Sequence, residues 1–247
     1  MRQIATWVRE NAANGPLIAL GIVALLLWGF VELADEVLEG ETHAFDVFVM
    51  QALRNVADLS DPLGPIWIEE LARDITALGG IAVLSLLVLA AAGFLWLIAQ
   101  HRLALFVLVA VGTGVALSLT MKMGFDRPRP DLTSAGTAVY TASFPSGHSL
   151  MSAVVYLTLG ALLARTMPRR AAKVYVMALA VLVVVMVGIS RIYLGVHWPT
   201  DVLAGWALGA GWALLAALVA NWLDQRGAVD HAPDDSHDSA DNNPEGG

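Results

Sequence analysis

Two histidines and an aspartate in the second half of the chain have the types and spacing of a nucleophilic site. His197 stands four positions before Asp201, and residues four apart share a face where a helix begins. A carboxylate bonded to one ring nitrogen fixes the histidine tautomer and leaves the other nitrogen free to attack. His148 would then protonate the leaving oxygen and afterwards activate water. This pattern predicts covalent catalysis through a histidine.

Cationic and small residues near these histidines suit a tetrahedral phosphate. Arginine donates to an oxyanion through two N–H groups, and lysine acts on it as a point charge. Lys122, Arg129 and Arg191 could together surround the non-bridging oxygens of one phosphate. Ser146 and Gly147 stand where a helix is expected to begin, so the hydroxyl and free backbone N–H groups would add to an anion site.

Composition excludes several other kinds of site. No carboxylate pair or multi-histidine ligand set accompanies the candidate residues, so we expect side-chain charge, and no metal or other cofactor, to neutralise the phosphate. The chain has no cysteine, which excludes disulfides, zinc–thiolate sites and a cysteine nucleophile. The basic residues are few and scattered, so we expect no nucleic-acid partner.

The candidate residues must be positioned by membrane helices. Of the 247 residues, 57% are hydrophobic and 15% charged, and the mean hydropathy is +0.65, whereas soluble chains are nearer half apolar and a quarter charged. A helix needs ~20 apolar residues to cross the hydrocarbon. We therefore predict an all-α fold, a polytopic membrane helix bundle with six transmembrane helices. The spans are expected at about 11–33, 80–99, 103–121, 147–165, 174–190 and 201–223.

These spans form one predicted membrane domain over 1–227, followed by a disordered acidic tail at 228–247. The first apolar block is expected to be a retained helix, because it is long for a signal peptide and no clear cleavage site follows it. The segment 35–79 is too polar to span and is divided by prolines. Its apolar residues recur at helical spacing on both sides of the prolines, which predicts short amphipathic helices in the first outer loop.

These amphipathic helices have two possible roles. In the first, residues such as Phe45 and Phe48 lie opposite Asp46, Gln51 and Arg54. We expect a packed cap over the bundle at the outer interface. The alternative role is a lip that guides a lipid headgroup into a site.

Both termini are expected in the cytoplasm, because basic residues collect on that side of a membrane. That side carries eight Lys or Arg residues, whereas the other carries six, of which four belong to the polar motifs. From this start, the spans at 103–121 and 174–190 run outward, and those at 147–165 and 201–223 run inward. The ends of the first pair and the starts of the second therefore meet at the outer face. All the candidate residues stand there.

Three motifs carry a resemblance to a known family. They read K-x6-R-P, P-S-G-H and S-R-x5-H-x3-D, and the chain contains them in this order. Their positions are Lys122 with Arg129-Pro130, Pro145-Ser146-Gly147-His148, and Ser190-Arg191 with His197 and Asp201. The chain thus resembles the type 2 phosphatidic acid phosphatases, the PAP2 or lipid phosphate phosphatase superfamily.

The resemblance implies a role for each motif residue. His197 would be the nucleophile, Asp201 its supporting carboxylate, and His148 the group that assists departure of the leaving oxygen. The phosphate would be bound, with no metal required, by Lys122, Arg129, Ser146, Gly147 and Arg191. Arg127 lies outside the strict pattern, so the resemblance gives it no role.

In its size and its predicted outward-facing site, the chain resembles the bacterial phosphatidylglycerophosphate and undecaprenyl diphosphate phosphatases. We therefore expect a hydrolase of the cytoplasmic membrane that cleaves a lipid phosphate monoester or diphosphate on the periplasmic or extracellular face through a phosphohistidine. One alternative is a phosphotransferase with a lipid diphosphate donor. Another is a non-catalytic protein that binds or transports a lipid phosphate. The sequence indicates neither the preferred lipid nor the oligomeric state.

Overall fold

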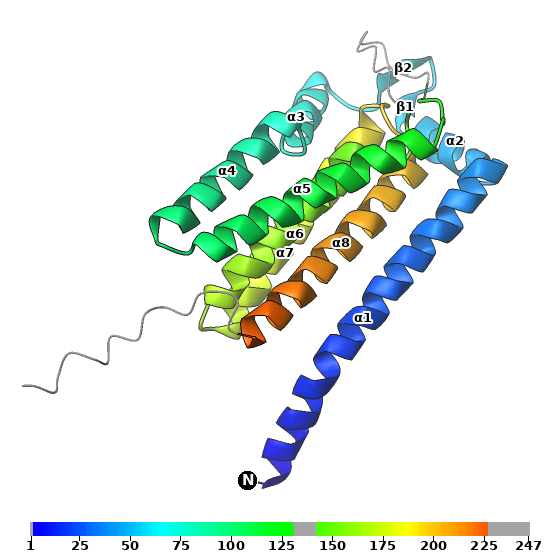
Figure 1. Cartoon of the computed structure of the whole chain (residues 1–247). Helices are drawn as coiled ribbons and strands as arrows, with labels where there is room; N and C mark the ends of the chain where they lie inside the picture. The colour runs from blue at the N-terminus through cyan, green and yellow to red at the C-terminus, as the bar shows by residue number, and fades with distance from the viewer. Residues whose placement is uncertain (1, 131–141, 227–247) are drawn as a thin grey trace, which may run out of the picture.

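The chain folds into a bundle of long helices with a small cap at one end (Figure 1). The structure is a computed structural model that describes residues 2–130 and 142–226, with side chains from residue 15 onward. The predicted tail at 228–247 lies outside the described residues. Two short strands, β1 (Arg54–Asn55) and β2 (Asp58–Pro62), pair antiparallel within the cap. The helices are α1 (Arg2–Glu39), α2 (His43–Ala52), α3 (Ile66–Ala77), α4 (Ile81–Leu97), α5 (His101–Gly124), α6 (Gly147–Thr166), α7 (Arg170–Tyr193) and α8 (Pro199–Gln225).

Five of the helices are each long and apolar enough to cross a membrane, namely α1 from Gly15 onward, α5, α6, α7 and α8. α4 has 17 residues and follows α3 across a bend of 44°, and this bent pair passes the same test as one span. Counting the pair gives up to six spans in the described part of the chain. The predicted all-α membrane bundle is therefore confirmed, with the small β1–β2 ribbon as an unpredicted addition.

Alternating helix directions gather the candidate residues at one end of the bundle. Figure 1 shows the last turn of α5 and the first turn of α8 beside α2 and the ribbon. The N-terminal end of α1 and the last turn of α8 lie at the opposite end. This is the relative arrangement that the count of spans predicted.

The cap differs from its prediction in a way that matters for the site. α2 ends at Ala52, and the chain then enters the ribbon, inside the segment 35–79 that was predicted to form short amphipathic helices. Asp46, on the polar side of α2, is fully buried, whereas Phe48 on the apolar side is 71% exposed. A buried carboxylate requires compensating partners. The inversion therefore indicates a polar centre beneath the cap.

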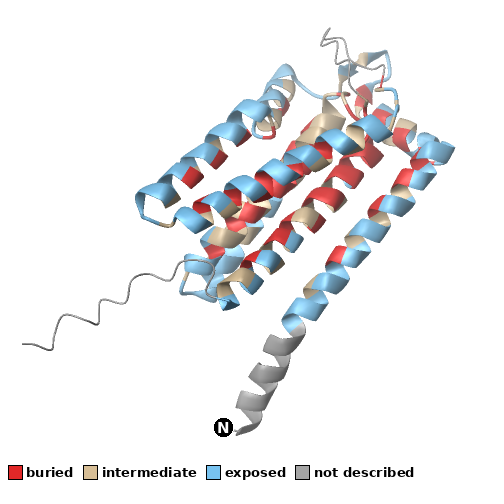
Figure 2. Ribbon diagram, in the orientation of Figure 1, coloured by how far each residue is buried: buried red, intermediate tan, exposed pale blue. Residues whose placement is uncertain are grey.

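α6 forms the centre of the bundle. It packs against α7 and α8, and α8 also packs against α1. Figure 2 shows buried residues along α6 and α8, whereas α4, and α1 from residue 15 onward, are mostly exposed. Gly205 and Gly209 of α8 permit a close crossing, since a Cβ on Gly209 would lie 2.5 Å from the carbonyl oxygen of Leu150. Small residues commonly let membrane helices approach in this way, and here they bring the first turns of α6 and α8 together.

Candidate active site

His197 lies in the short loop between α7 and α8, and its ring is held on both sides. Its Nδ1 is 3.3 Å from Oδ2 of Asp201, and its Nε2 is 3.1 Å from Nη1 of Arg129. A guanidinium can only donate, so Nε2 is the acceptor. Nδ1 therefore carries the proton and donates a hydrogen bond to Asp201. This tautomer gives Nε2 the free lone pair that a nucleophile needs.

The first turn of α8 fixes Asp201 in place. Pro199 begins the helix, where its missing N–H leaves no bond unmade. The fully buried Asp201 accepts through Oδ2 from the backbone N–H of Trp198 at 2.9 Å. The same oxygen accepts from the hydroxyl of Ser143. One carboxylate thus caps its own helix and orients the histidine.

Burial controls the protonation of His197. The residue is 1% exposed, and desolvation lowers its pKa to about 4, although the hydrogen bond and charge of Asp201 act in the opposite direction. A histidine free in water titrates near a pH of about 6.5. The buried ring therefore stays neutral in a range where a free ring would be protonated.

We expect the ring nitrogen signals of His197 to remain those of neutral imidazole down to about pH 5, because protonation is displaced to about 4. The folded pKa lies below the unfolded one, so the unfolded chain binds more protons in this window, and His197 lowers stability as the pH falls. The measurement is a pH titration by ¹⁵N NMR of histidine-labelled protein in micelles, with His197→Ala for assignment. Half-protonation near pH 6.5, about the free value, would contradict the expectation.

The start of α6 joins the other two motifs. Ser146 caps this helix through its hydroxyl, and its backbone N–H donates to the carbonyl of Asp201 at 2.9 Å. A Cβ on Gly147 would lie 3.5 Å from Nζ of Lys122. The ammonium of Lys122 therefore lies close to the first turn of α6, whose free N–H groups favour an anion.

Arg129 and Arg191 add further positive charge at this end. Arg129 donates from Nη1 to the carbonyl of Val196 at 2.8 Å, and Arg191 donates from Nη1 to Oγ1 of Thr76 at 3.1 Å. His148, in the first turn of α6, interacts electrostatically with Lys122, Arg129, Arg191 and His197. The structure thus brings every predicted site residue to one place.

One buried atom in this place has no partner. Nε of Arg191 forms no hydrogen bond with the residues that the structure describes, and a buried unsatisfied donor costs free energy. A phosphate oxygen is a suitable acceptor for it. Within residues 2–130 and 142–226, no three His, Cys, Asp or Glu side chains are grouped so as to hold a metal ion. Metal independence stays a prediction.

Two residues of this centre were missed by the sequence reasoning. Arg127 was given no role, yet its Nη1 donates to Oδ1 of Asp201 at 2.6 Å and its Nη2 to Oδ2 of Asp46 at 2.6 Å. Its position in the same polar run as Arg129 was the available signal. Asp46 gave no such signal, because a lone carboxylate on an amphipathic helix usually faces water.

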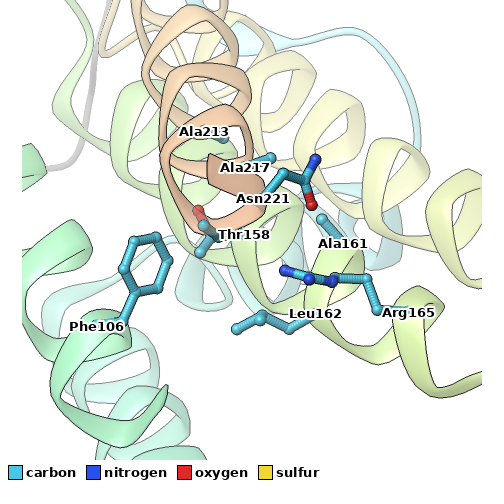
Figure 3. A pocket seen from close by; sticks show the side chains of 9 residues that line it. Phe106, Thr158, Ala161, Leu162, Arg165, Ala213, Ala217 and Asn221 are labelled. Carbon is cyan, nitrogen blue, oxygen red and sulfur yellow. The ribbon is translucent and has the colours of Figure 1, made fainter. Parts of the chain in front are cut away.

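A separate pocket of about 140 Å³ lies between α5, α6 and α8 (Figure 3). It lies toward the C-terminal ends of α6 and α8, whereas His197 precedes the first turn of α8. Phe106, Ala213 and Arg165 are among its lining residues. The guanidinium of Arg165 pairs with Asp224 at 2.8 Å. No predicted site residue lines this pocket, so the candidate chemistry lies elsewhere.

The chain is similar to known membrane phosphatases. The family model of the PAP2 superfamily matches residues 103–225. Phosphatidylglycerophosphatase B of Bacillus subtilis (strain 168) is 37% identical over 147 residues, which cover 58% of this chain and 70% of the relative. An undecaprenyl-diphosphatase of Sulfolobus acidocaldarius is 40% identical over 77 residues, which cover 31% of this chain and 33% of the relative.

A solved structure agrees over a larger part of the chain. The crystal structure described as the first transmembrane PAP2 type phosphatidylglycerolphosphate phosphatase, from Bacillus subtilis, superposes with a TM-score of 0.70 at 30% identity. The match covers 83% of this chain and 96% of that one. The expectation of a membrane-embedded phosphatase is confirmed at the level of the family.

Proposed function

This chain belongs to the PAP2 superfamily, and we propose that it hydrolyses a lipid phosphate or diphosphate through a phosphohistidine at His197, without a metal ion. One observation carries the proposal. The buried pair of His197 and Asp201 directs an unprotonated Nε2 toward Arg129. Arg191, in the same site, has a buried guanidinium N–H that still needs an acceptor. A nucleophile and an oxyanion site are thus adjacent.

In the first step, Nε2 of His197 attacks phosphorus, and the bond from phosphorus to the lipid oxygen breaks. Arg129 donates to Nε2 in the free chain, so its N–H must turn to a phosphate oxygen before attack. Asp201 accepts the hydrogen bond of the Nδ1–H group and stabilises the positive charge that develops on the ring. His148 gives a proton to the departing oxygen. The products are the lipid alcohol, or a lipid monophosphate, and a phosphohistidine.

In the second step, water attacks the phosphohistidine and the bond from phosphorus to nitrogen breaks. His148, now neutral, takes the proton of the attacking water. Lys122, Arg129 and Arg191 stabilise the negative charge on the phosphate oxygens in both transition states. Inorganic phosphate leaves, and His197 returns to its starting tautomer.

The lipid nature of the substrate follows from where the site lies. The candidate residues stand at the ends of membrane helices, so a phosphate attached to an apolar chain can reach them from the interface. Relatives are named for phosphatidylglycerophosphate and undecaprenyl diphosphate, and we infer a substrate of this class. The basic residues favour cytoplasmic termini. We therefore place the site on the outer face of the cytoplasmic membrane.

Phosphate release by the purified chain in micelles tests this proposal. The substrates are undecaprenyl diphosphate, phosphatidylglycerophosphate, phosphatidic acid and water-soluble glycerol 3-phosphate, each with and without EDTA. We expect turnover of at least one lipid at a rate that EDTA does not change, and slower turnover of glycerol 3-phosphate. Loss of activity in EDTA would contradict metal independence. No phosphate release from any substrate would overturn hydrolysis.

A further inference from the structure

A carboxylate from the cap reaches the proposed nucleophile through an arginine. We propose that Asp46 of α2 and Arg127 are positioning residues, which hold Asp201 in the orientation that His197 needs. This inference rests on the proposed function of His197. It assigns a role in the reaction to the first outer segment, beyond that of a packed cap.

Arg127 connects two buried carboxylates. Its side chain is 12% exposed, whereas those of Asp46 and Asp201 are completely buried. Nη1 donates to Oδ1 of Asp201 and Nη2 to Oδ2 of Asp46, each at 2.6 Å. Such short, charge-assisted bonds are about twice as strong as neutral ones. The planar guanidinium therefore sets the position of one carboxylate relative to the other.

The contact with Arg127 determines how the Asp201 carboxylate is rotated. Its Oδ2 takes the donors of His197, Trp198 and Ser143, whereas Oδ1 takes Arg127. An ionised carboxylate accepts at both oxygens, so donors on Oδ1 and Oδ2 together fix its rotation. Without Arg127 the group could rotate, and Oδ2 would move away from Nδ1 of His197. Misplacement by about 1 Å can lower a catalytic rate by about 100-fold.

Asp46 also holds the helix that carries Asp201. Its Oδ1 accepts from the backbone N–H of Thr200 at 3.0 Å, and its Oδ2 accepts from the Thr200 hydroxyl at 2.7 Å. That hydroxyl in turn accepts from Nη1 of Arg127 at 2.8 Å. An anion is favoured at a helix N-terminus, so Asp46 serves as a cap for α8 from another part of the chain. These hydrogen bonds connect α2 to the first turn of α8, next to the loop that carries His197.

Stability alone does not account for this arrangement. Buried ion pairs commonly stabilise a fold no better than apolar residues of similar volume. Two carboxylates and one guanidinium moreover leave a net negative charge in the cluster. The carboxylate of Asp201 lies beside the ring of His197 that becomes cationic during attack, so its negative charge favours the transition state more than the resting state.

The test compares Asp46→Asn with Asp74→Asn in the full-length protein, using phosphatidic acid in mixed micelles. Asparagine keeps an acceptor for the N–H of Thr200 but loses the charge that binds Arg127. We expect Asp46→Asn to lower kcat by about 10- to 100-fold and to leave KM within about threefold, because the phosphate-binding side chains are untouched. The exposed Asp74 belongs to the same outer segment, and its variant should match the wild type.

A double-mutant cycle separates positioning from a purely structural role. Arg127→Met leaves Asp46 and Asp201 buried together without their cation, so adding Asp46→Asn removes one of two repelling charges. We expect the double variant to be at least as active as Arg127→Met, although Asp46→Asn alone is harmful. Independent effects would instead multiply. Thermal unfolding of each variant identifies any that fails to fold, and Arg127→Lys serves as the milder partner.

Several outcomes would overturn the inference. An unchanged kcat in folded Asp46→Asn removes the positioning role while the wild type still hydrolyses phosphatidic acid and the proposed function stands. A raised KM with an unchanged kcat would assign Asp46 to substrate binding instead. A wild type that hydrolyses none of the lipid phosphates tested above would overturn the proposed function itself, and with it the role in catalysis.

Discussion

Replacing His197 with alanine should lower kcat for a lipid phosphate by about 10⁴-fold or more, which is the size of effect seen when a nucleophile is removed. Alanine keeps the loop and the cationic site but has no atom that can attack phosphorus. We therefore expect KM to change little, because Lys122 and Arg191 remain. The measurement is phosphate release by purified variant and wild type in the same micelles. Trapping of labelled phosphate on the protein should disappear in parallel.

His101→Ala is the matched control for this substitution. His101 begins α5 at the end of the bundle remote from the site, and its ring contacts Trp96. We expect this variant to keep the wild-type kcat, and to trap as much labelled phosphate on the protein as the wild type does. Normal turnover by a folded His197→Ala protein would show that another group attacks phosphorus. Equal losses in both variants would indicate damage to the fold.

The convergence of the motifs could be predicted because it depends on few quantities. Apolar blocks fix the number of spans, and the number of spans decides which helix ends share a face. Spacing then adds detail, since His197 and Asp201 four positions apart meet at the start of α8. The structure places the residues together as predicted, and their roles remain predictions.

The parts of the centre that come from the cap were not predictable in the same way. Amphipathic patterns report which residues share a face, but they do not say whether the polar face meets water or a buried charge. Asp46 was therefore assigned only to the polar face of an amphipathic helix, and Arg127, its partner, had no evident function. Their contact joins distant parts of the chain, and one sequence carries no signal for such a pairing. The ribbon at Arg54–Pro62 was missed because two short strands leave little periodic pattern.

The approach of α6 to α8 is a second feature that spacing alone did not reveal. Gly205 and Gly209 lie one turn apart on α8. A Cβ on Gly205 would lie 2.8 Å from the carbonyl oxygen of Ser146, the residue that caps α6. The crossing therefore positions the phosphate-binding turn of α6 against the helix that carries Asp201.

Gly209→Ala should consequently destabilise the protein and lower its activity. The added Cβ would lie 2.5 Å from the carbonyl oxygen of Leu150 and 2.8 Å from Cβ of Ala153, and backbone atoms cannot move aside without shifting a helix. Overpacking of this kind costs about 1–3 kcal/mol of unfolding free energy. Separating the helices also moves Ser146 away from Asp201, so kcat should fall. Thermal unfolding by circular dichroism in micelles, together with phosphate release, measures both effects.

Gly112→Ala provides the matched control, because Gly112 is also inside a membrane helix and a Cβ there would meet nothing within 4 Å. Alanine is the better helix former by about 1 kcal/mol, so this variant should be as stable as the wild type or more so, with normal turnover. The two substitutions add the same methyl group, and only the space around it differs. If Gly209→Ala unfolded at the same temperature as Gly112→Ala and kept its kcat, the close crossing of α6 and α8 would not be what holds the site together.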